Sequence, residues 1–578
     1  MANKSSVIAK SIFFGGNILT MEDSLPEVES IAVLDGVILA LGSLSDVMKF
    51  AGDETEFIYL NKNTLLPGFI EPHQHAINRI KESCQSINIG AYYCKTAEEV
   101  INKIRVEVNS VLPNADKVPT PWCIFTGWDP ELVPNLPKLN ADFIEKEFSS
   151  VIPILIIAQN LHSSFVNRKI FEITNITKDY KSKPDDFLTD SNGELTGEIK
   201  KATNSFLLIS KAPPASESRL AYAITRIYRD YSSRGYTTVT ELAYEPNKVI
   251  DELIKSVASR RDCPVRLALY QKEDITKDIS ELHPINSPDI DKLWLAGVKL
   301  WADGSPHSGT MAVREPYLKS TLTDFLSFPK APNYGHLTFS TDTLYHKVCF
   351  YHKLGLQIAI HAQGERAIEQ VLDVYQRVIP AKDNRIRHRI EHLGLATEKQ
   401  LALCEKLGIC PSFFVDQLRV YGSTFSEYLL GADRTNRWSP LATAIKLGCT
   451  ISIHQDNPAF PGPPLPFSNI KTAVTRSEAK GDKMVHGESE RISVHEAIKA
   501  CTIGPAWQLF REDKLGSLKV GKFADFVILT QNPYTVSGDE LGEIQVVETY
   551  IGGYCNGFST KNDMKIPSLR ILESTNAH

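Results

Sequence analysis

Two histidines that stand two residues apart are the first of several side chains in this sequence that could bind a metal ion. His73 and His75 lie in the stretch GFIEPHQHA. Alternate residues of an extended segment share one face, so both imidazoles can approach one ion. An isolated pair of this kind is also compatible with a polar turn. The interpretation therefore depends on four further candidate ligands, which are Lys299, His361, His392 and Asp456.

Lys299 stands inside the apolar stretch LWLAGVKLWAD, where a strand would bury its ammonium group. Burial of a charge is costly unless the charge is paired or neutralised. One solution is an ion pair with Glu241 or Asp303. The other is a lysine with a lowered pKa that takes up carbon dioxide and becomes a carbamate bridging two metal ions. Both solutions remain open here, and the other candidate ligands favour the carbamate.

The remaining candidates stand at the ends of apolar runs. His361 closes LQIAIHA, and in RHRIEH the alternation places His388 and His392 on the same strand face; we select His392 because it is nearer the end of the strand. Asp456 follows ISIHQ and precedes an Asn-Pro turn. Alone, these residues are compatible with core histidines and a turn-forming aspartate. In a metal site, Asp456 would orient a water molecule, whose pKa zinc lowers to about 7, and take its proton.

These residues follow a repeated pattern of short apolar strand, polar loop and amphipathic helix. The strand candidates are LLPGFIEP, TTVTEL, VRLALY, GVKLWAD, LQIAIHA, RHRIEHLG, GICPSFF and CTISIHQD. Such β/α alternation predicts an α/β fold with a closed (β/α)8 TIM barrel, whose strand ends meet at one mouth. The candidate ligands would meet there. An open doubly wound sheet is the alternative, which the number of strands does not exclude.

The rest of the chain is expected to form smaller units around this barrel. Short strands in residues 1–66 and 511–560 predict that the two ends of the chain pair into one small sheet domain. The barrel would occupy residues 67–510, with an inserted lobe of about 81–215 after the first barrel strand, and residues 561–578 would form a tail.

Composition excludes several classes of protein. The 578 residues carry a net charge of -6, so no basic field is available for nucleic acid. No run reaches the ~18 apolar residues of a membrane helix, and the N-terminus lacks the apolar core of a signal peptide. The ten cysteines include no CxxC pair, which favours a reducing, cytoplasmic location.

The ordered set of motifs resembles the amidohydrolase superfamily, specifically amidohydrolase family 3, from about Ser11 to Gly557. The motifs are GFIEPHQHA, LTGEI, GVKLWADGS, HAQGERAIEQVLD, RHRIEH, QDNP and LGSLKVGKFADFVIL. The resemblance implies the barrel and the split sandwich, and one or two zinc ions. It also implies roles: His73 and His75 on the first metal, Lys299 as a carboxylated bridge, His361 and His392 on the second metal, Asp456 as acid/base and His162 as a lid residue facing the substrate.

Four positions depart from the pattern usual in relatives. Glu71 and Glu365 stand where relatives have aspartate, Gln74 replaces a small or branched residue, and Gln455 replaces a serine. All ligand positions are present, so we expect an active hydrolase. We expect these four residues to affect substrate preference and metal occupancy, not the fold.

The leading hypothesis is hydrolysis of a non-peptide carbon–nitrogen bond, of amide or N-substituted formamide type, in a small-molecule substrate. Trp128, Trp301, Phe413 and Phe414 would line an apolar pocket or belong to the core. Two other functions stay open: a regulatory or binding protein that keeps the fold without turnover, and a metal-dependent decarboxylase or isomerase. A homodimer is expected from the family resemblance only.

Overall fold

The computed structural model describes residues 7–117, 119–177, 186–200, 202–273, 285–379, 385–479, 484–555 and 570–571. The tail predicted at 561–578 therefore lies outside the described residues, except for the strand β23 (Arg570–Ile571). No helix within the described ranges is long and apolar enough to cross a membrane.

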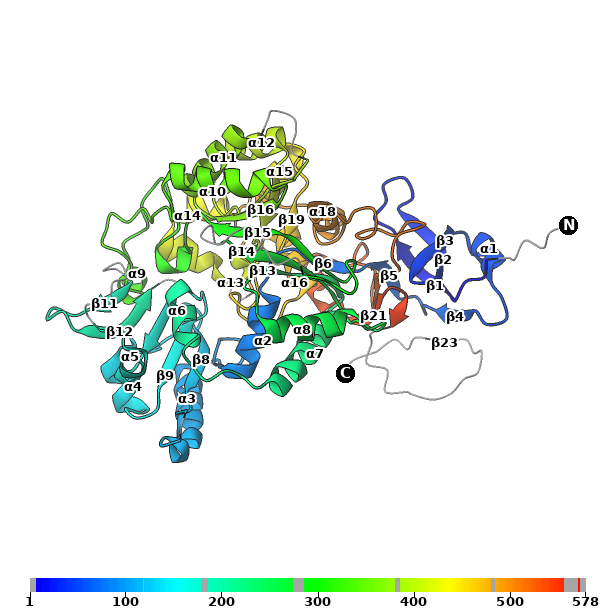
Figure 1. Ribbon diagram of the computed structural model, residues 1–578. Helices are drawn as coiled ribbons and strands as arrows, with labels where there is room; N and C mark the ends of the chain where they lie inside the picture. Colours follow the sequence, from blue (N-terminus) through cyan, green and yellow to red (C-terminus); the bar gives the residue numbers. More distant parts are fainter. Residues whose placement is uncertain are drawn as a thin grey trace.

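Eight parallel strands form the central sheet (Figure 1). In sheet order they are β6 (Phe69–Glu71), β13 (Tyr236–Tyr244), β14 (Arg266–Lys272), β15 (Leu293–Trp301), β16 (Gln357–Ala362), β17 (Arg389–His392), β18 (Cys410–Phe413) and β19 (Ser452–Ile453). This order follows the chain without the reversal that defines a doubly wound sheet. The prediction of a barrel is therefore confirmed, as a nearly closed one.

Helices surround the barrel. Figure 1 shows α10 (Thr341–Lys353), α11 (Glu365–Val378), α12 (Glu398–Leu407) and α15 (Leu441–Lys446) on one side, and α7 (Glu217–Ser233) and α8 (Lys248–Ala258) on the other. Their limits follow local sequence. Helix α12 starts at a capping box between Thr397 and Gln400 and ends at Gly408, whose φ of 65° a residue with a Cβ adopts poorly.

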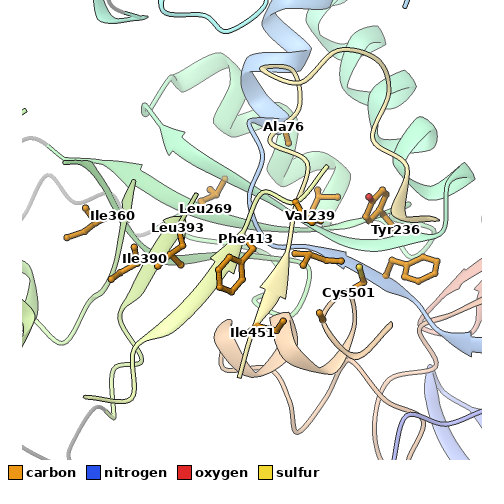
Figure 2. Packing of buried hydrophobic residues seen from close by; sticks show 14 of the residues in the cluster. Ala76, Tyr236, Val239, Leu269, Ile360, Ile390, Leu393, Phe413, Ile451 and Cys501 are labelled. Atoms are coloured by element: carbon orange, nitrogen blue, oxygen red, sulfur yellow. The ribbon is translucent and has the colours of Figure 1, made fainter. Parts of the chain in front are cut away.

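A single large apolar cluster joins the strands to these helices. Figure 2 shows part of it, including Val239 on β13, Leu269 on β14 and Phe413 on β18. Phe413 is fully buried in this cluster, so it belongs to the core and does not line a substrate pocket. Packing of this kind fixes the strand ends, which carry the candidate ligands.

The predicted first strand, LLPGFIEP, is divided into two at Gly68. Strand β5 (Thr64–Pro67) pairs with β1 (Ser11–Leu19) and β20 (Phe526–Leu529), whereas β6 begins the barrel. A Cβ on Gly68 would stand 2.1 Å from the Thr237 side chain. The absence of a side chain therefore lets the chain pass from one sheet into the other.

Strands from both ends of the chain share a nine-stranded sheet. Besides β1, β5, β20 and β23, it contains β2 (Glu27–Leu34), β3 (Val37–Gly42), β4 (Glu56–Tyr59), β21 (Val546–Ile551) and β22 (Tyr554–Cys555). The rings of Phe13, Phe526 and Tyr550 pack together with centroids 4.8 to 5.1 Å apart. This contact ties the two ends of the chain to each other.

A six-stranded sheet lies on the opposite side of the barrel from the nine-stranded sheet (Figure 1). Its strands are β7 (Ile87–Asn88), β8 (Cys123–Trp128), β9 (Ile154–Ala158), β10 (Ser163–Val166), β11 (Phe187–Thr189) and β12 (Leu195–Lys200). The helices beside it are α3 (Ala97–Val111), α4 (Ala141–Glu147), α5 (Arg168–Thr174) and α6 (Ala202–Ile209). Just after β9, Gln159 donates from Nε2 to the carbonyl oxygen of Pro458, 2.9 Å away in a barrel loop.

Candidate metal centre

His73, His75 and Asp456 meet at the carboxyl end of the barrel strands. The Nε2 atoms of His73 and His75 lie 3.5 and 3.2 Å from Asp456 Oδ1. The three residues form one of two groups of side chains in the described part of the chain whose nitrogen and oxygen atoms could hold a metal ion. Two residues that follow the first barrel strand and one that follows the last are thus neighbours in space.

Two residues of the centre have a strained backbone. His392 has a φ of 75° and Asp456 a φ of 55°, both in the left-handed region. A residue with a Cβ adopts this region at a cost of about 1 to 2 kcal/mol. Such strain is retained mainly at functional sites, where it directs a side chain that regular strand geometry would place elsewhere.

Glu391 fixes the orientation of His73, and sequence reasoning did not identify it. His73 donates from Nδ1 to Glu391 Oε2 at 2.6 Å, which leaves Nε2 as the nitrogen directed into the centre. Arg389 holds Glu391 through Nε at 2.7 Å and Nη2 at 3.0 Å. A carboxylate behind a histidine is the arrangement that orients metal ligands. The available signal was the sequence Arg-Ile-Glu-His, in which alternation directs Arg389 and Glu391 the same way.

Lys299 is buried beside His73. Its Nζ is 3.3 Å from His73 Nε2, and burial lowers the pKa of Lys299 to about 8, although Glu391 and Asp456 oppose this shift. Within the described residues neither Glu241 nor Asp303 forms an ion pair with Lys299; these carboxylates lie beside His75 and His361 instead. The ion-pair alternative for Lys299 is therefore wrong. A neutral amine at this position is the form that reacts with carbon dioxide.

His361 lies beside the centre but outside both ligand groups. Its ring centroid is 4.4 Å from that of His392, while its Nε2 donates to the carbonyl oxygen of Gly304 at 3.0 Å. Asp303, 3.4 Å from the same nitrogen, accepts the backbone N–H groups of Ala312, Gln363 and Gly364. These bonds hold the loop after β15 against the start of α11.

His388 and His392 point in opposite directions, contrary to the prediction of a shared face. His388 is bonded to His352 on α10 and stacks on Tyr375 of α11. His392 contacts the rings of His73 and His361. The positive φ of His392 turns the chain at the strand end, so its side chain enters the centre while His388 remains among the helices.

His454 is a further histidine of the centre that the sequence reasoning did not select. It is fully buried, and its Nε2 lies 3.1 Å from His392 Nδ1. His73, His392 and His454 form the second group that could hold a metal ion. The signal in the sequence was the alternation of His454 with Asp456, two residues apart after an apolar strand.

The charge pattern of the centre fits a cation. Burial opposes protonation of His75, but its contacts with Asp456 and Glu241 raise the pKa of His75 to about 9. A positive charge is thus stabilised between these two carboxylates. The buried atoms Asp456 Oδ1 and His75 Nδ1 have no hydrogen-bond partner in the described residues. The two imidazoles and one carboxylate of His73, His75 and Asp456 are a donor set that suits zinc and similar ions.

A pocket lies between the six-stranded sheet and the barrel loops. It contains about 570 Å³ of space between atoms, part of it open to solvent, and its lining includes Trp128 and His307. His307 bonds to both carboxylate oxygens of Glu131 at 3.0 Å. Burial lowers the pKa of His162 to about 4, against the influence of the nearby Asp456. Trp128 thus lines this pocket, whereas His162 is not among its lining residues and is instead close enough to Asp456 to feel its charge.

The other aromatic candidates lie close to the metal centre. The Lys299 ammonium is 5.5 Å from the centre of the Trp301 ring, and the Phe414 ring is 5.3 Å from that of His454. Gln455 and Gln74 are two of the positions that differ from the pattern usual in relatives. Gln455 donates to Asp416. Gln74 is fully buried, and neither of its side-chain polar atoms has a hydrogen-bond partner in the described residues.

Residues 56–555 match the sequence model of the amidohydrolase family. The chain belongs to the amidohydrolase family. Protein LONG AFTER FAR-RED 3 of Arabidopsis thaliana is 28% identical over 566 residues, which cover 95% of this chain and 92% of that protein. N-substituted formamide deformylase of Arthrobacter pascens is 22% identical over 550 residues, covering 94% and 97%. Membership supports hydrolase activity on a small-molecule substrate in a metal-dependent superfamily.

A solved structure shares the fold. The crystal structure of an uncharacterized metal-dependent hydrolase from Pyrococcus horikoshii OT3 superposes with a TM-score of 0.69 at 20% identity, covering 92% of this chain and 99% of that one. The two chains therefore share their overall fold.

Proposed function

We propose that this amidohydrolase cleaves a non-peptide carbon–nitrogen bond, of amide or N-substituted formamide type, by addition of water. The observation that carries the proposal is the position of Asp456, whose Oδ1 lies 3.5 and 3.2 Å from the Nε2 atoms of His73 and His75. A carboxylate that can take a proton thus stands beside nitrogens that can hold a metal ion. The similarity to a formamide deformylase supports the same bond type.

His73, His75 and Asp456 are the residues that would hold the ion, and we propose zinc, with carboxylated Lys299 as a further ligand. When bound, zinc polarises a carbonyl group and makes water more acidic. Asp456 Oδ1 accepts the proton of the attacking water and donates it to the leaving nitrogen, so the carbon–oxygen bond forms as the carbon–nitrogen bond breaks. Glu391 keeps His73 in the required orientation through its bond to Nδ1.

The six-stranded unit supplies the other wall of the substrate site in this proposal, as an inserted lobe. Trp128 at the end of β8 lines the pocket, and Gln159 joins the lobe to the loop that follows Asp456. His162 faces the substrate from the lobe, and Trp301 contacts it from the barrel. Burial keeps His162 neutral at pH 7, which makes it a hydrogen-bonding group and not a cation.

The test is a substrate screen on the full chain loaded with zinc. Amides, N-substituted formamides, lactams and esters are offered in ¹⁸O-labelled water, and products are identified by mass. We expect an amine product and ¹⁸O in the acid product. Asp456→Asn should lose at least a hundredfold in kcat, whereas Asp433→Asn, on the exposed start of α14 (Ala432–Asn436), should not.

Two results would contradict the proposal. A product without ¹⁸O would indicate a decarboxylase or isomerase. A protein that binds zinc but turns over nothing in the panel, and whose biological effect survives Asp456→Asn, would indicate a regulatory or binding role.

A further inference from the structure

A second pocket lies between the six-stranded sheet and α2 (Ala76–Gln85), the helix that begins directly after His75. It contains about 600 Å³ of space between atoms, part of it open to solvent, and most of the surface that lines it is apolar. The proposed mechanism assigns no role to this pocket. Its apolar lining residues are Ile124 on β8, Ile157 on β9, Leu161, Ile209 on α6 and Pro458.

Two loops connect this pocket to the metal centre. Leu161 directly precedes His162, and Pro458 follows Asp456 by two residues. Two residues of extended chain span at most about 7 Å, so the Cα atoms of Pro458 and Asp456 lie within that distance of each other. The wall of the pocket is therefore within reach of a substituent on a substrate held at the centre.

Helix α2 forms a wall of the pocket and is fixed near both ends. Asn78 donates its backbone N–H to Glu241 Oε2 at 3.3 Å, and the other oxygen of this carboxylate lies 3.5 Å from His75 Nδ1. Farther along the helix, Glu82 Oε1 accepts a hydrogen bond from the Thr126 hydroxyl on β8 at 2.5 Å. The pocket is thus held in place relative to the centre and exists before a ligand binds, as ligand sites usually do.

The turn between β9 and β10 separates this pocket from the first one. Gln159 and Asn160 line the first pocket, whereas Leu161 lines the second and His162 lines neither. The Leu161 N–H donates to the carbonyl oxygen of Ala158 at 3.0 Å, and the His162 N–H donates to Asn160 Oδ1 at 2.8 Å. Leu161 has a φ of 60°, in the left-handed region that leucine adopts only at a cost. Such strain is retained mainly at functional sites, and here it accompanies consecutive side chains that enter different spaces.

We propose that this second pocket binds an apolar substituent of the substrate, an alkyl or aryl group attached to the amide, and that Leu161 and Ile209 limit its size. The inference rests on the proposed function for the amide but not for the apolar group. Each methylene group that enters the pocket leaves water, so affinity should rise with the length of the substituent until the pocket is filled.

Binding of 1-alkanols tests the pocket without turnover, because they carry an alkyl chain and no carbon–nitrogen bond. Ethanol, 1-butanol and 1-hexanol are titrated into the zinc-loaded full chain, and binding is followed by NMR. We expect affinity to rise about two- to fourfold per methylene group.

Two variants of the lining locate the binding. Leu161→Asn replaces an apolar side chain by an amide in a residue type that tolerates positive φ, and Ile209→Trp fills the space. Each should lower the affinity for 1-hexanol by about fivefold or more. The control is Ile173→Asn, at an exposed position on α5 of the same six-stranded unit, which should bind 1-hexanol like the wild type.

Two series of amides then identify the part of the substrate that enters the pocket. One series lengthens the alkyl chain on the nitrogen, and the other lengthens the chain on the carbonyl carbon. We expect kcat/KM to rise with chain length in one of the two series. Leu161→Asn should remove this rise, whereas Ile173→Asn should retain it.

Wild-type affinity for 1-hexanol in a folded Leu161→Asn or Ile209→Trp protein would overturn the inference. Amide cleavage that does not depend on chain length in either series, or whose dependence survives Leu161→Asn, would also overturn it. If one variant does not fold, the other decides. Failure of the proposed function would instead appear as the absence of amide cleavage, whereas the alkanol titration needs no turnover.

Discussion

Asp456 donates its backbone N–H to the carbonyl oxygen of His73 at 3.2 Å, while the side chains of the same two residues meet at 3.5 Å. A second bond, from the His75 N–H to the carbonyl oxygen of Asn457 at 2.9 Å, lies beside it. These bonds join the loop after the first barrel strand to the loop after the last. The residues that close the barrel at its mouth are thus also those proposed to bind metal.

Loss of the negative charge on Glu391 should weaken metal binding. We expect Glu391→Gln to lower Zn²⁺ affinity by about 10- to 100-fold, since a carboxylate behind a ligand raises its basicity and fixes its orientation. Equilibrium dialysis measures the affinity, and circular dichroism checks that the variant is folded. Glu405→Gln, at an exposed position on α12, is the matched control. Wild-type affinity in Glu391→Gln would show that the bond to His73 is not needed for binding.

Lys299→Ala should remove the proposed bridging carbamate. We expect loss of activity and of bound metal, with partial recovery when a short-chain carboxylic acid is added, because that acid can occupy the vacated space as an anion. The control is Lys399→Ala, on the surface of α12. Its metal content and rate should equal those of the wild type, and the added acid should change neither. Metal content and rate are measured with and without acid. A variant with wild-type metal content and rate would contradict the carbamate.

His388 should make stability depend on pH. Burial, with His352 adding to it, lowers the pKa of His388 to about 3. Between that value and about 6.5 the unfolded chain binds a proton at this residue that the folded chain does not. Stability therefore falls as pH decreases below about 6.5, by at most ~1.4 kcal/mol per pH unit from this group.

Replacement of His388 should flatten this profile. We expect His388→Gln to be less stable at pH 7.5, since the Ile358 N–H loses its Nδ1 acceptor at 3.0 Å, but to lose less stability than the wild type between pH 6.5 and 5. Urea midpoints across this range measure the effect, and His346→Gln, exposed on the same helix as His352, should follow the wild-type slope. If the stability of His388→Gln and of the wild type fell with pH at the same rate, His388 would not be the source of the pH dependence.

Gly68→Ala should destabilise the junction between the two sheets. Its Cβ would stand 2.1 Å from Thr237 Cγ2 and 2.4 Å from Thr237 Oγ1, so one strand must move. Overpacking of this kind costs about 1 to 3 kcal/mol. Thr237→Ala removes both atoms, and the double variant should be more stable than the sum of the single effects predicts. Strict additivity in urea denaturation would show that the two residues do not compete for space.

Much of the barrel was predictable from the sequence because its signals are local. The strands are short apolar runs that end in polar residues, and in the described residues most are followed by a helix, as β17 is by α12 with its caps at Thr397 and Gly408. The order of strands in the sheet then follows from the order in the chain. The choice of His73, His75 and Asp456 as neighbours also followed, since the ends of parallel strands meet at one mouth.

The sequence by itself thus determined the barrel, the family and the edge of the sheet where the chemistry lies. Tertiary structure decided which atoms meet. Whether His388 or His392 enters the centre depends on one positive φ, and the roles of Glu391 and His454 depend on contacts with residues far away in the chain. Local periodicity specifies the face of a strand, but nitrogen-to-oxygen distances of about 3 Å are set by packing between strands.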